Sequence, residues 1–305
     1  MHGNVHIDGA VSGDSLRVVA IGGSVEMAAA EYRVIDIQTG SYGRKNTNFV
    51  HIDGIKAESV RARAIEVNIF LSGSAGTADL GAVNGSIEAR GLTVGAVEAK
   101  ANGEGSFVGV SDVSSTATFM AVDGIVSADD LDVKSLIATS VGKSAEINMN
   151  GSAEHVILKS VGGKLYAGAL SVENIIAESI DKGAFVEFAG PAGSATCKVV
   201  DGRMSGILMD SKKLDVKIFG KKASAEFFGK AESVTYDAMT GTIFADGLEA
   251  ENAVAKASDG GSIDCHVTGS LEAKIPIKKG RIRYSGEPKE VIADKEDLER
   301  RIQKK

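Results

Sequence analysis

Proline, tryptophan and cysteine are all scarce in this chain, and each scarcity excludes something. Three prolines in 305 residues, about 1% where roughly 5% is usual, argue against long irregular loops. The absence of tryptophan and the aromatic content of 5% argue against a sugar-binding groove or a base-stacking platform, because both rely on exposed rings. Two cysteines, Cys197 and Cys265, are too few for a disulfide framework and predict buried thiols in a reducing compartment.

The chain also lacks an excess of basic residues and long apolar runs. The net charge of −7 and the isoelectric point near 5.4 argue against a general affinity for nucleic acid or anionic membranes. No window approaches 18 consecutive apolar residues, so no membrane insertion is expected, and the first residues resemble neither a signal peptide nor a transit peptide. We therefore expect an intracellular location, in the cytosol or, after removal of a transit peptide, in an organelle such as the mitochondrion. A secreted or cell-surface location would require that a leader has been cleaved.

Glycine, in contrast, is abundant and marks an internal repeat. The 37 glycines make up about 12% of the chain, where roughly 7% is usual. Short corners of glycine, serine, asparagine or aspartate precede alternating apolar runs, as at 85–89, 163–167 and 241–245. The first inward apolar residues of the repeats follow one another at 18 to 25 positions, on average about 20. These anchors are Val5, Val25, Val50, Ile69, Ile87, Phe107, Ile125, Ile147, Leu165, Val186, Met204, Ala225, Ile243, Ile263 and Ile282.

The repeat predicts a solenoid. Alternation of period two in short runs rich in valine and isoleucine indicates strands, and a unit of about 20 residues buries its apolar side only by stacking on the next unit. We therefore expect an all-β fold, a single-domain parallel β-helix of about fifteen coils over residues 1–288. Residues 25–68 keep the period less well and could bulge out as a loop.

The end of the chain follows another pattern. Residues 289–305 are charged and contain no glycine, and Val291, Leu298 and Ile302 are spaced for one helical face. We expect a short C-terminal helix or tail there, which caps the last coil or docks a partner.

No catalytic, cofactor or metal site is expected. Gly142-Lys143-Ser144 lacks the upstream glycine of a phosphate-binding loop, and the five histidines do not cluster with other ligands. Several carboxylates could stack from coil to coil into the acidic cleft of a β-helix carbohydrate-active enzyme, but the repeats contain almost no inserted residues and no tryptophan to build such a cleft. These carboxylates are Asp123, Asp129, Asp130, Asp132, Glu173, Glu178 and Asp181. The two cysteines lie four coils apart, nearly 20 Å at about 4.8 Å per coil, and cannot form a disulfide.

One basic cluster is a candidate docking surface for an acidic partner. It comprises Lys212, Lys213, Lys217, Lys221 and Lys222. The alternative is a solvated ridge, because lysine commonly protects exposed strand edges from sticking.

The C-terminal half resembles a known family. Residues 241–274 and the closing Tyr284-Ser-Gly286-Glu-Pro288 resemble the adhesin-like β-helix family that includes the head (GIN) domain of auto-transporter adhesins. The resemblance covers about residues 80–290 and implies a parallel β-helix without established catalytic residues and with a binding surface.

Three functions are compatible with this sequence. We favour a non-enzymatic binding or scaffold protein that presents β-helix faces to a protein partner, as a subunit of a larger assembly. The first alternative is a self-assembling filament protein, since the chain also bears a weaker similarity to bactofilins. The second is a β-helix carbohydrate-active enzyme. A homo-oligomer is possible, and no nucleic-acid partner and no cofactor are expected.

Overall fold

The computed structural model describes residues 4–40, 49–276, 279–293 and 301–305. These residues form an all-β parallel β-solenoid of about fifteen turns, which confirms the predicted fold class. Two compact units divide the chain, Met1–Ala153 and Glu154–Lys305, and each is described by itself. The assignment of residues 1–288 to a single domain stays a prediction.

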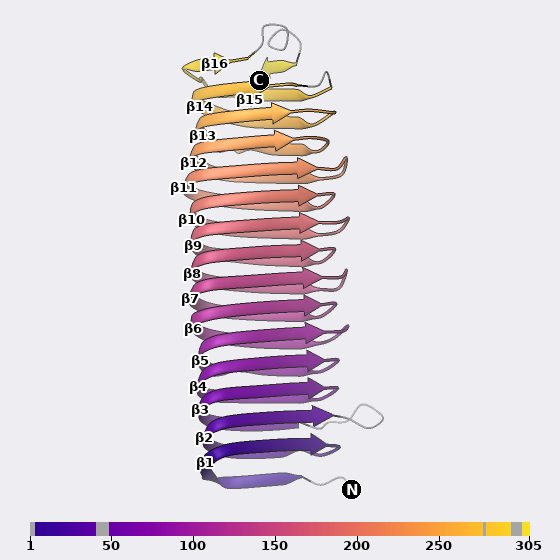
Figure 1. Ribbon diagram of the computed structural model, residues 1–305, viewed down its shortest axis with the longest axis vertical. Coiled ribbons are helices and arrows are strands. Elements are labelled where there is room, and N and C mark those ends of the chain that lie inside the picture. Colours follow the sequence, from indigo (N-terminus) through magenta and orange to yellow (C-terminus); the bar gives the residue numbers. More distant parts are fainter. Residues whose placement is uncertain (1–3, 41–48, 277–278, 294–300) are drawn as a thin grey trace. The chain divides into compact units, whose positions relative to one another are not determined.

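The first unit stacks its strands in chain order (Figure 1). Each strand pairs in parallel with the next, so that Val50 lies opposite Ile69 and Ile69 lies opposite Ile87. These register steps of 19 and 18 residues match the repeat of the sequence. The strands of this unit are β1 (Val5–Ile21), β2 (Val25–Gly40), β3 (Phe49–Ile65), β4 (Asn68–Val83), β5 (Ser86–Asn102), β6 (Phe107–Val122), β7 (Ile125–Val141) and the first part of β8 (Glu146–Val161).

The second unit follows the same rule. Leu165, Val186, Met204, Ala225 and Ile243 lie opposite one another on successive strands. All five side chains are buried, and they form one column of the core. The strands after β8 are β9 (Lys164–Ile180), β10 (Phe185–Val200), β11 (Arg203–Phe219), β12 (Ser224–Ala238), β13 (Thr242–Ala257), β14 (Ser262–Lys274), β15 (Arg281–Ser285), β16 (Glu290–Ile292) and β17 (Ile302–Lys304).

Each long strand is bent near its middle. The bend of β11 contains Asp210 with a φ of 59°, and the bend of β12 contains Gly229 with a φ of 111°. The pairing register between these two strands shifts at this point, between Leu208 and Ser211. A strand therefore consists of two halves, and the bends of successive strands lie next to one another along one edge of the unit. We refer to this edge as the bend edge.

Two predicted anchors are wrong by one residue. Ile125 is 38% exposed, whereas Val126 is fully buried, and Val108 replaces Phe107 in the same column. Side chains alternate between the two faces of a strand, so a shift of one residue moves every side chain to the other face.

The region that keeps the repeat less well forms regular coils where it is described. β2 and β3 pair from Val25 opposite Val50 to Thr39 opposite Ala64. The extra residues of this stretch fall within 41–48, outside the described residues. The question left open for residues 25–68 is thus answered for β2 and β3, which form regular coils.

The expected C-terminal helix is also wrong where the chain is described. β16 pairs in parallel with β14, and β17 pairs in parallel with β15, whereas the described residues contain no helix. Val291 and Ile302 lie on two separate short strands, and each strand continues a ladder of the preceding coil. These strands form because the unpaired edges of the last coils offer backbone hydrogen bonds to an extended chain. Leu298 lies outside the described residues. The tail does cover the last coil, since Ile282 and Ile302 lie opposite each other and are both buried.

The bend of β12 allows a direct test of the backbone conformation described here. A Cβ atom at position 229 would overlap the carbonyl oxygen of Leu208, and φ is positive there. Gly229→Ala should therefore lower the free energy of unfolding by at least about 2 kcal/mol, measured by guanidinium denaturation. Gly168→Ala is the matched control, because a Cβ at position 168 meets no atom within 4 Å. Equal midpoints for the two variants would contradict this account of the bend.

Candidate functional site

An exposed apolar patch lies on the first halves of three neighbouring strands of the second unit. Ile207 of β11, Phe228 of β12 and Phe244 of β13 are 44%, 40% and 45% exposed. Ile207 lies directly opposite Phe228, and Phe228 lies opposite Gly247 of β13. Phe244 lies opposite Glu226, two residues before Phe228 on β12. We call these three side chains the apolar patch.

The apolar patch is held in place by its neighbours. A Cβ atom at position 247 would overlap the ring of Phe228, so the glycine lets this ring lie close against β13. The inward neighbour Phe227 is fully buried in the core. Because the backbone of β12 is fixed between two paired strands, Phe228 has a defined position without being buried. An ordered, exposed aromatic ring is typical of interaction hot spots.

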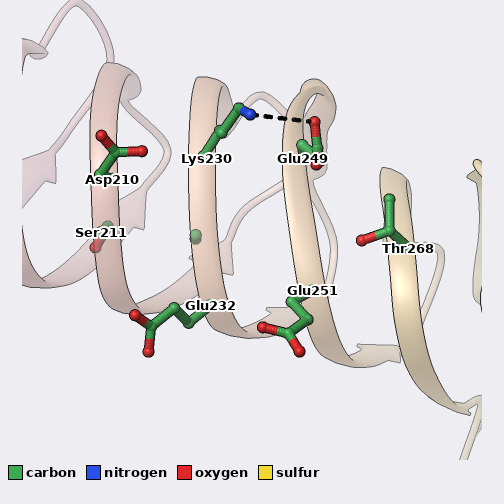
Figure 2. Close-up of a pocket in the computed structure, with 8 residues that line it drawn as sticks. Asp210, Ser211, Lys230, Glu232, Glu249, Glu251 and Thr268 are labelled. Atoms are coloured by element: carbon green, nitrogen blue, oxygen red, sulfur yellow. Dashed lines mark ion pairs between the residues drawn. The ribbon is translucent and has the colours of Figure 1, made fainter.

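A groove runs along the bend edge beside the apolar patch. Its volume is about 330 Å³. Figure 2 shows Asp210, Lys230 and Glu249 along one side of the bends and Glu232 and Glu251 along the other. Ser211, Ala231 and Thr268 complete its lining. We call this feature the bend groove.

The bend groove is acidic. Lys230 forms an ion pair with Glu249 at 3.9 Å (Figure 2). Asp210, Glu232 and Glu251 are exposed and form no ion pair or hydrogen bond with other described residues. Four carboxylates against one ammonium group leave a net charge of about −3, which attracts cations and cationic side chains.

Patch and groove are contiguous in the chain. Phe228 precedes Lys230 by two residues, and Ile207 precedes Asp210 by three. An apolar centre with a polar, charged rim is the usual anatomy of a protein–protein interface. An apolar surface beside an acidic groove is chemically suited to contact apolar and cationic side chains.

The predicted lysine cluster is spread along β11. Lys212 and Lys213 follow the bend directly, and Lys213 forms an ion pair with Asp215 at 3.1 Å. Lys217 lies on the second half of β11, opposite Lys198 and Asp237. Lys221 and Lys222 lie in the turn after β11, nine residues beyond Lys212 and Lys213 and roughly 25–30 Å away along an extended strand. Only Lys212 and Lys213 thus come close to the bend groove, and a docking role for the five stays a prediction.

Four of the seven carboxylates considered for a catalytic cleft have structural partners, one of them Glu178, which pairs with Lys159 at 4.0 Å and Lys198 at 3.8 Å. Asp129 accepts a hydrogen bond from Asn150 Nδ2 at 2.8 Å, and Asp132 accepts one from Ser152 Oγ at 2.8 Å. Asp123 accepts a hydrogen bond from the Ser144 backbone N–H at 3.3 Å in the turn between two strands. These aspartate contacts link successive coils of the first unit.

The cysteines are buried and unbridged, as predicted. Burial, together with the charges of Asp246 and Asp264 and against a smaller opposing effect of Lys305, raises the pKa of the Cys265 thiol to about 12. Burial, with a smaller contribution from Asp215, raises the pKa of Cys197 as well. The described part of the chain holds no group of three histidine, cysteine or acidic residues that could bind a metal ion. No helix among the described residues is long and apolar enough to span a membrane.

Sequence reasoning missed the apolar patch. A signal was available in the pairs Gly206-Ile207 and Phe227-Phe228, where the second residue must point away from the core if the first points inward. Such reasoning needs the inward positions to within one residue, and the errors at Phe107 and Ile125 show how easily these are misplaced.

One comparison with known proteins found a match, which agrees with the fold and lies in the second unit. Residues 195–288 match the model of a family described as "Putative auto-transporter adhesin, head GIN domain". The matched segment contains the complete apolar patch and bend groove. No curated protein and no solved structure matches the chain.

The family match supports the class of protein that the fold and the site indicate, a binding protein. An adhesin-like domain on a β-solenoid suggests a protein-binding role and favours a non-enzymatic protein.

Proposed function

We propose that the chain is a non-enzymatic binding protein and that a protein partner docks on the apolar patch and the bend groove. The observation that carries this proposal is the group of three large apolar side chains, 40–45% exposed on adjacent strands beside an acidic groove. Scattered exposed apolar residues are common, whereas an ordered apolar group with a charged rim is typical of interaction sites.

The charges of the surface define the partner. The net charge of about −3 in the bend groove favours a partner segment with lysine or arginine side chains. Apolar side chains of the same segment would cover Phe228 and Phe244. Lys212 and Lys213, at the rim, would contact carboxylates of the partner, which retains part of the docking role proposed for the lysine cluster. We propose that this partner is one component of a larger assembly.

The family description bears on the location of the protein. An auto-transporter adhesin acts outside the cell or at its surface, so the match at 195–288 supports a secreted or cell-surface location. It does not support the intracellular location expected from the cysteine content and the first residues. Free buried thiols are compatible with either compartment, because burial protects them from oxidation.

Substitution in the apolar patch should abolish tight binding. We expect Phe228→Asp to weaken binding of the partner recovered with the wild-type chain at least about 30-fold, because a desolvated aromatic hot spot contributes about 2 kcal/mol or more. The measurement is a titration of purified partner by interferometry or calorimetry. Phe228 is exposed, so the fold should tolerate the change.

Ile176→Asp is the matched control, since Ile176 is 48% exposed on the second half of β9 and lies away from the patch. Glu251→Lys should weaken the same complex through charge alone. Unchanged affinity of Phe228→Asp, or an equal loss for Ile176→Asp, would rule out the apolar patch as the docking surface.

A further inference from the structure

The turns between the coils of the second unit carry an excess of cationic side chains. These turns follow one another along the side of the unit opposite to the bends (Figure 1). We consider the turns after β8, β9, β10 and β11, each from the last outward residue before the turn to the first one after it. Eight exposed cations and three carboxylates leave a net charge of about +5 there. We call the eight cations the basic turn edge: Lys159, Lys164, Lys182, Lys198, Arg203, Lys217, Lys221 and Lys222.

The cations of the basic turn edge form a row along the unit. The turns 181–184 and 220–223 are each closed by a backbone hydrogen bond between their fourth and first residues, and each carries a lysine at its second position. These two turns lie two coils apart, which is about 10 Å at 4.8 Å per coil. Short turns precede the other two members of the row. The row thus has one cation per coil, at steps of about 5 Å, and comprises Lys164, Lys182, Arg203 and Lys221.

Most of these charges are not neutralised by a neighbouring carboxylate. Glu178 is shared between Lys159 at 4.0 Å and Lys198 at 3.8 Å. The guanidinium group of Arg203 lies over the ring of Phe185, 5.8 Å from its centroid, so an aromatic ring holds this cation in place and leaves its charge available. The members that form no ion pair with another described residue are Lys164, Lys182, Lys217, Lys221 and Lys222.

The aspartates of these turns have a structural role. Asp181 and Asp201 have φ values of 80° and 55°, a left-handed conformation that aspartate tolerates better than most residues. A Cβ atom at position 220 would overlap Asp201 Oδ1, so this carboxylate lies against the backbone of the next long turn. Glu187, Asp215 and Glu226 lie one outward position further from the turns, and the net charge stays positive when they are included.

Protection of an unpaired strand edge does not account for the lysines. β10 pairs with β9 on one side and with β11 on the other, and β11 also pairs with β12. These strands therefore have no free edge that a lysine would need to protect. Lys198 lies directly opposite Lys217, and like charges in opposite positions destabilise a sheet. A repulsive pair that the fold does not need indicates a role in binding.

We propose that the basic turn edge binds a linear acidic polysaccharide, whose chain runs along the row of cations. A polymer with regularly spaced carboxylate or sulfate groups meets one cation at each coil, whereas a folded acidic protein offers no such regular spacing. Nucleic acid fits less well, because Arg203 occupies the face of Phe185 that a base would need for stacking. The secreted or cell-surface location that the family description supports is one where polysaccharides are met. The bend groove lies on the other side of the unit, so the two proposals are independent.

Binding of oligogalacturonates of graded length to the full chain tests the proposal. Fluorescence anisotropy should show binding at about 50 mM NaCl that weakens at least about 10-fold at about 300 mM, because salt screens exposed charges. The affinity should rise with chain length until the oligomer spans the row, roughly 15 Å, and change little beyond that. Neutral dextran should not bind.

Two double variants of β11 and its turn locate the site. Lys221→Glu/Lys222→Glu should weaken oligogalacturonate binding at least about 10-fold, because it reverses two charges of the row. Lys212→Glu/Lys213→Glu is the matched control, since it changes the net charge equally and lies more than a Debye length of about 10 Å away at 0.1 M salt. Both variants should keep the wild-type thermal midpoint, because all four side chains are exposed. No binding by the wild-type chain, equal losses in the two variants, or tighter binding of single-stranded DNA or polyglutamate of equal charge would overturn the proposal.

Discussion

Raising the pH from 8.5 to 10 should destabilise the second unit by roughly 3 kcal/mol through its two thiols alone. Burial raises the pKa of Cys265 to about 12, and the pKa of Cys197 is raised in the same direction. In the unfolded chain both thiols ionise near pH 8.5. The folded state therefore retains protons that the unfolded state loses, and stability falls as the pH rises above that value. Each thiol contributes about 0.7 kcal/mol per pH unit at pH 8.5, where the unfolded thiol is half ionised, and about 1.4 kcal/mol per pH unit well above it.

The double variant Cys197→Ala/Cys265→Ala separates this effect from other alkaline titrations. Alanine occupies the neighbouring positions of the same columns, at Ala177 and Ala245, so the replacements fit the core. The measurement is the guanidinium midpoint, followed by circular dichroism between pH 8.5 and 10. The wild-type chain should lose clearly more stability than the variant over this range. Parallel pH profiles would show that the thiols do not stay protonated in the folded state.

Asp264→Ala should release the end of the second unit. The side chain of Asp264 is 5% exposed, accepts a hydrogen bond from Arg283 Nε at 2.7 Å and lies 3.2 Å from Lys305 Nζ. The carboxylate thus ties β14 to β15 and to the residue after β17. Removal of one member of a buried ion pair typically costs 3–5 kcal/mol, but both cations are about one-third exposed and can regain water. We therefore expect a loss of about 2–3 kcal/mol in local stability.

Hydrogen exchange of residues 281–285 measures this loss, and the labelling rate of the Cys265 thiol reports the same opening, because Cys265 lies opposite Tyr284. Asp237→Ala is the control, since the Asp237 carboxylate is 27% exposed and pairs with Lys256 at 3.6 Å. Such surface pairs contribute about 1 kcal/mol or less. Equal exchange rates in the two variants would contradict the role of Asp264.

The repeat made the fold predictable. A strand that pairs in parallel with the next coil must present an inward residue at a fixed register, and this produces the spacing of about 20 residues that the sequence displays. Thirteen of the fifteen anchors lie at the predicted positions, as in the column from Leu165 to Ile282. The glycines mark the bends and turns where φ is positive, as at Gly190 and Gly229.

The end of the chain was not predictable from its periodicity. Val291 and Ile302 are spaced as on a helical face, yet each lies on a three-residue strand. Such short strands carry almost no pattern of their own, and they form because the ladders of β14 and β15 offer unpaired backbone groups. Tertiary context decided the structure here, against local propensity.

The candidate site could not be predicted from the sequence for a different reason. The lysine cluster of β11 and the following turn was predicted because its members are close in sequence. The bend groove instead contains carboxylates from β11, β12 and β13 that are about 20 residues apart. The apolar patch likewise joins Ile207, Phe228 and Phe244 across three strands. The register between coils places Ile207 opposite Phe228, and Phe244 opposite Glu226, two residues before Phe228.

Photo-cross-linking from position 228 tests the central claim, that a protein partner docks on the apolar patch. A benzoylphenylalanine residue at position 228 should form a covalent adduct with one protein under native conditions, and the same residue at position 176 should give little or none of it. Excess Glu251→Lys chain should compete poorly for this adduct compared with excess wild-type chain. Equal yields from positions 228 and 176, or no adduct from position 228, would contradict the claim.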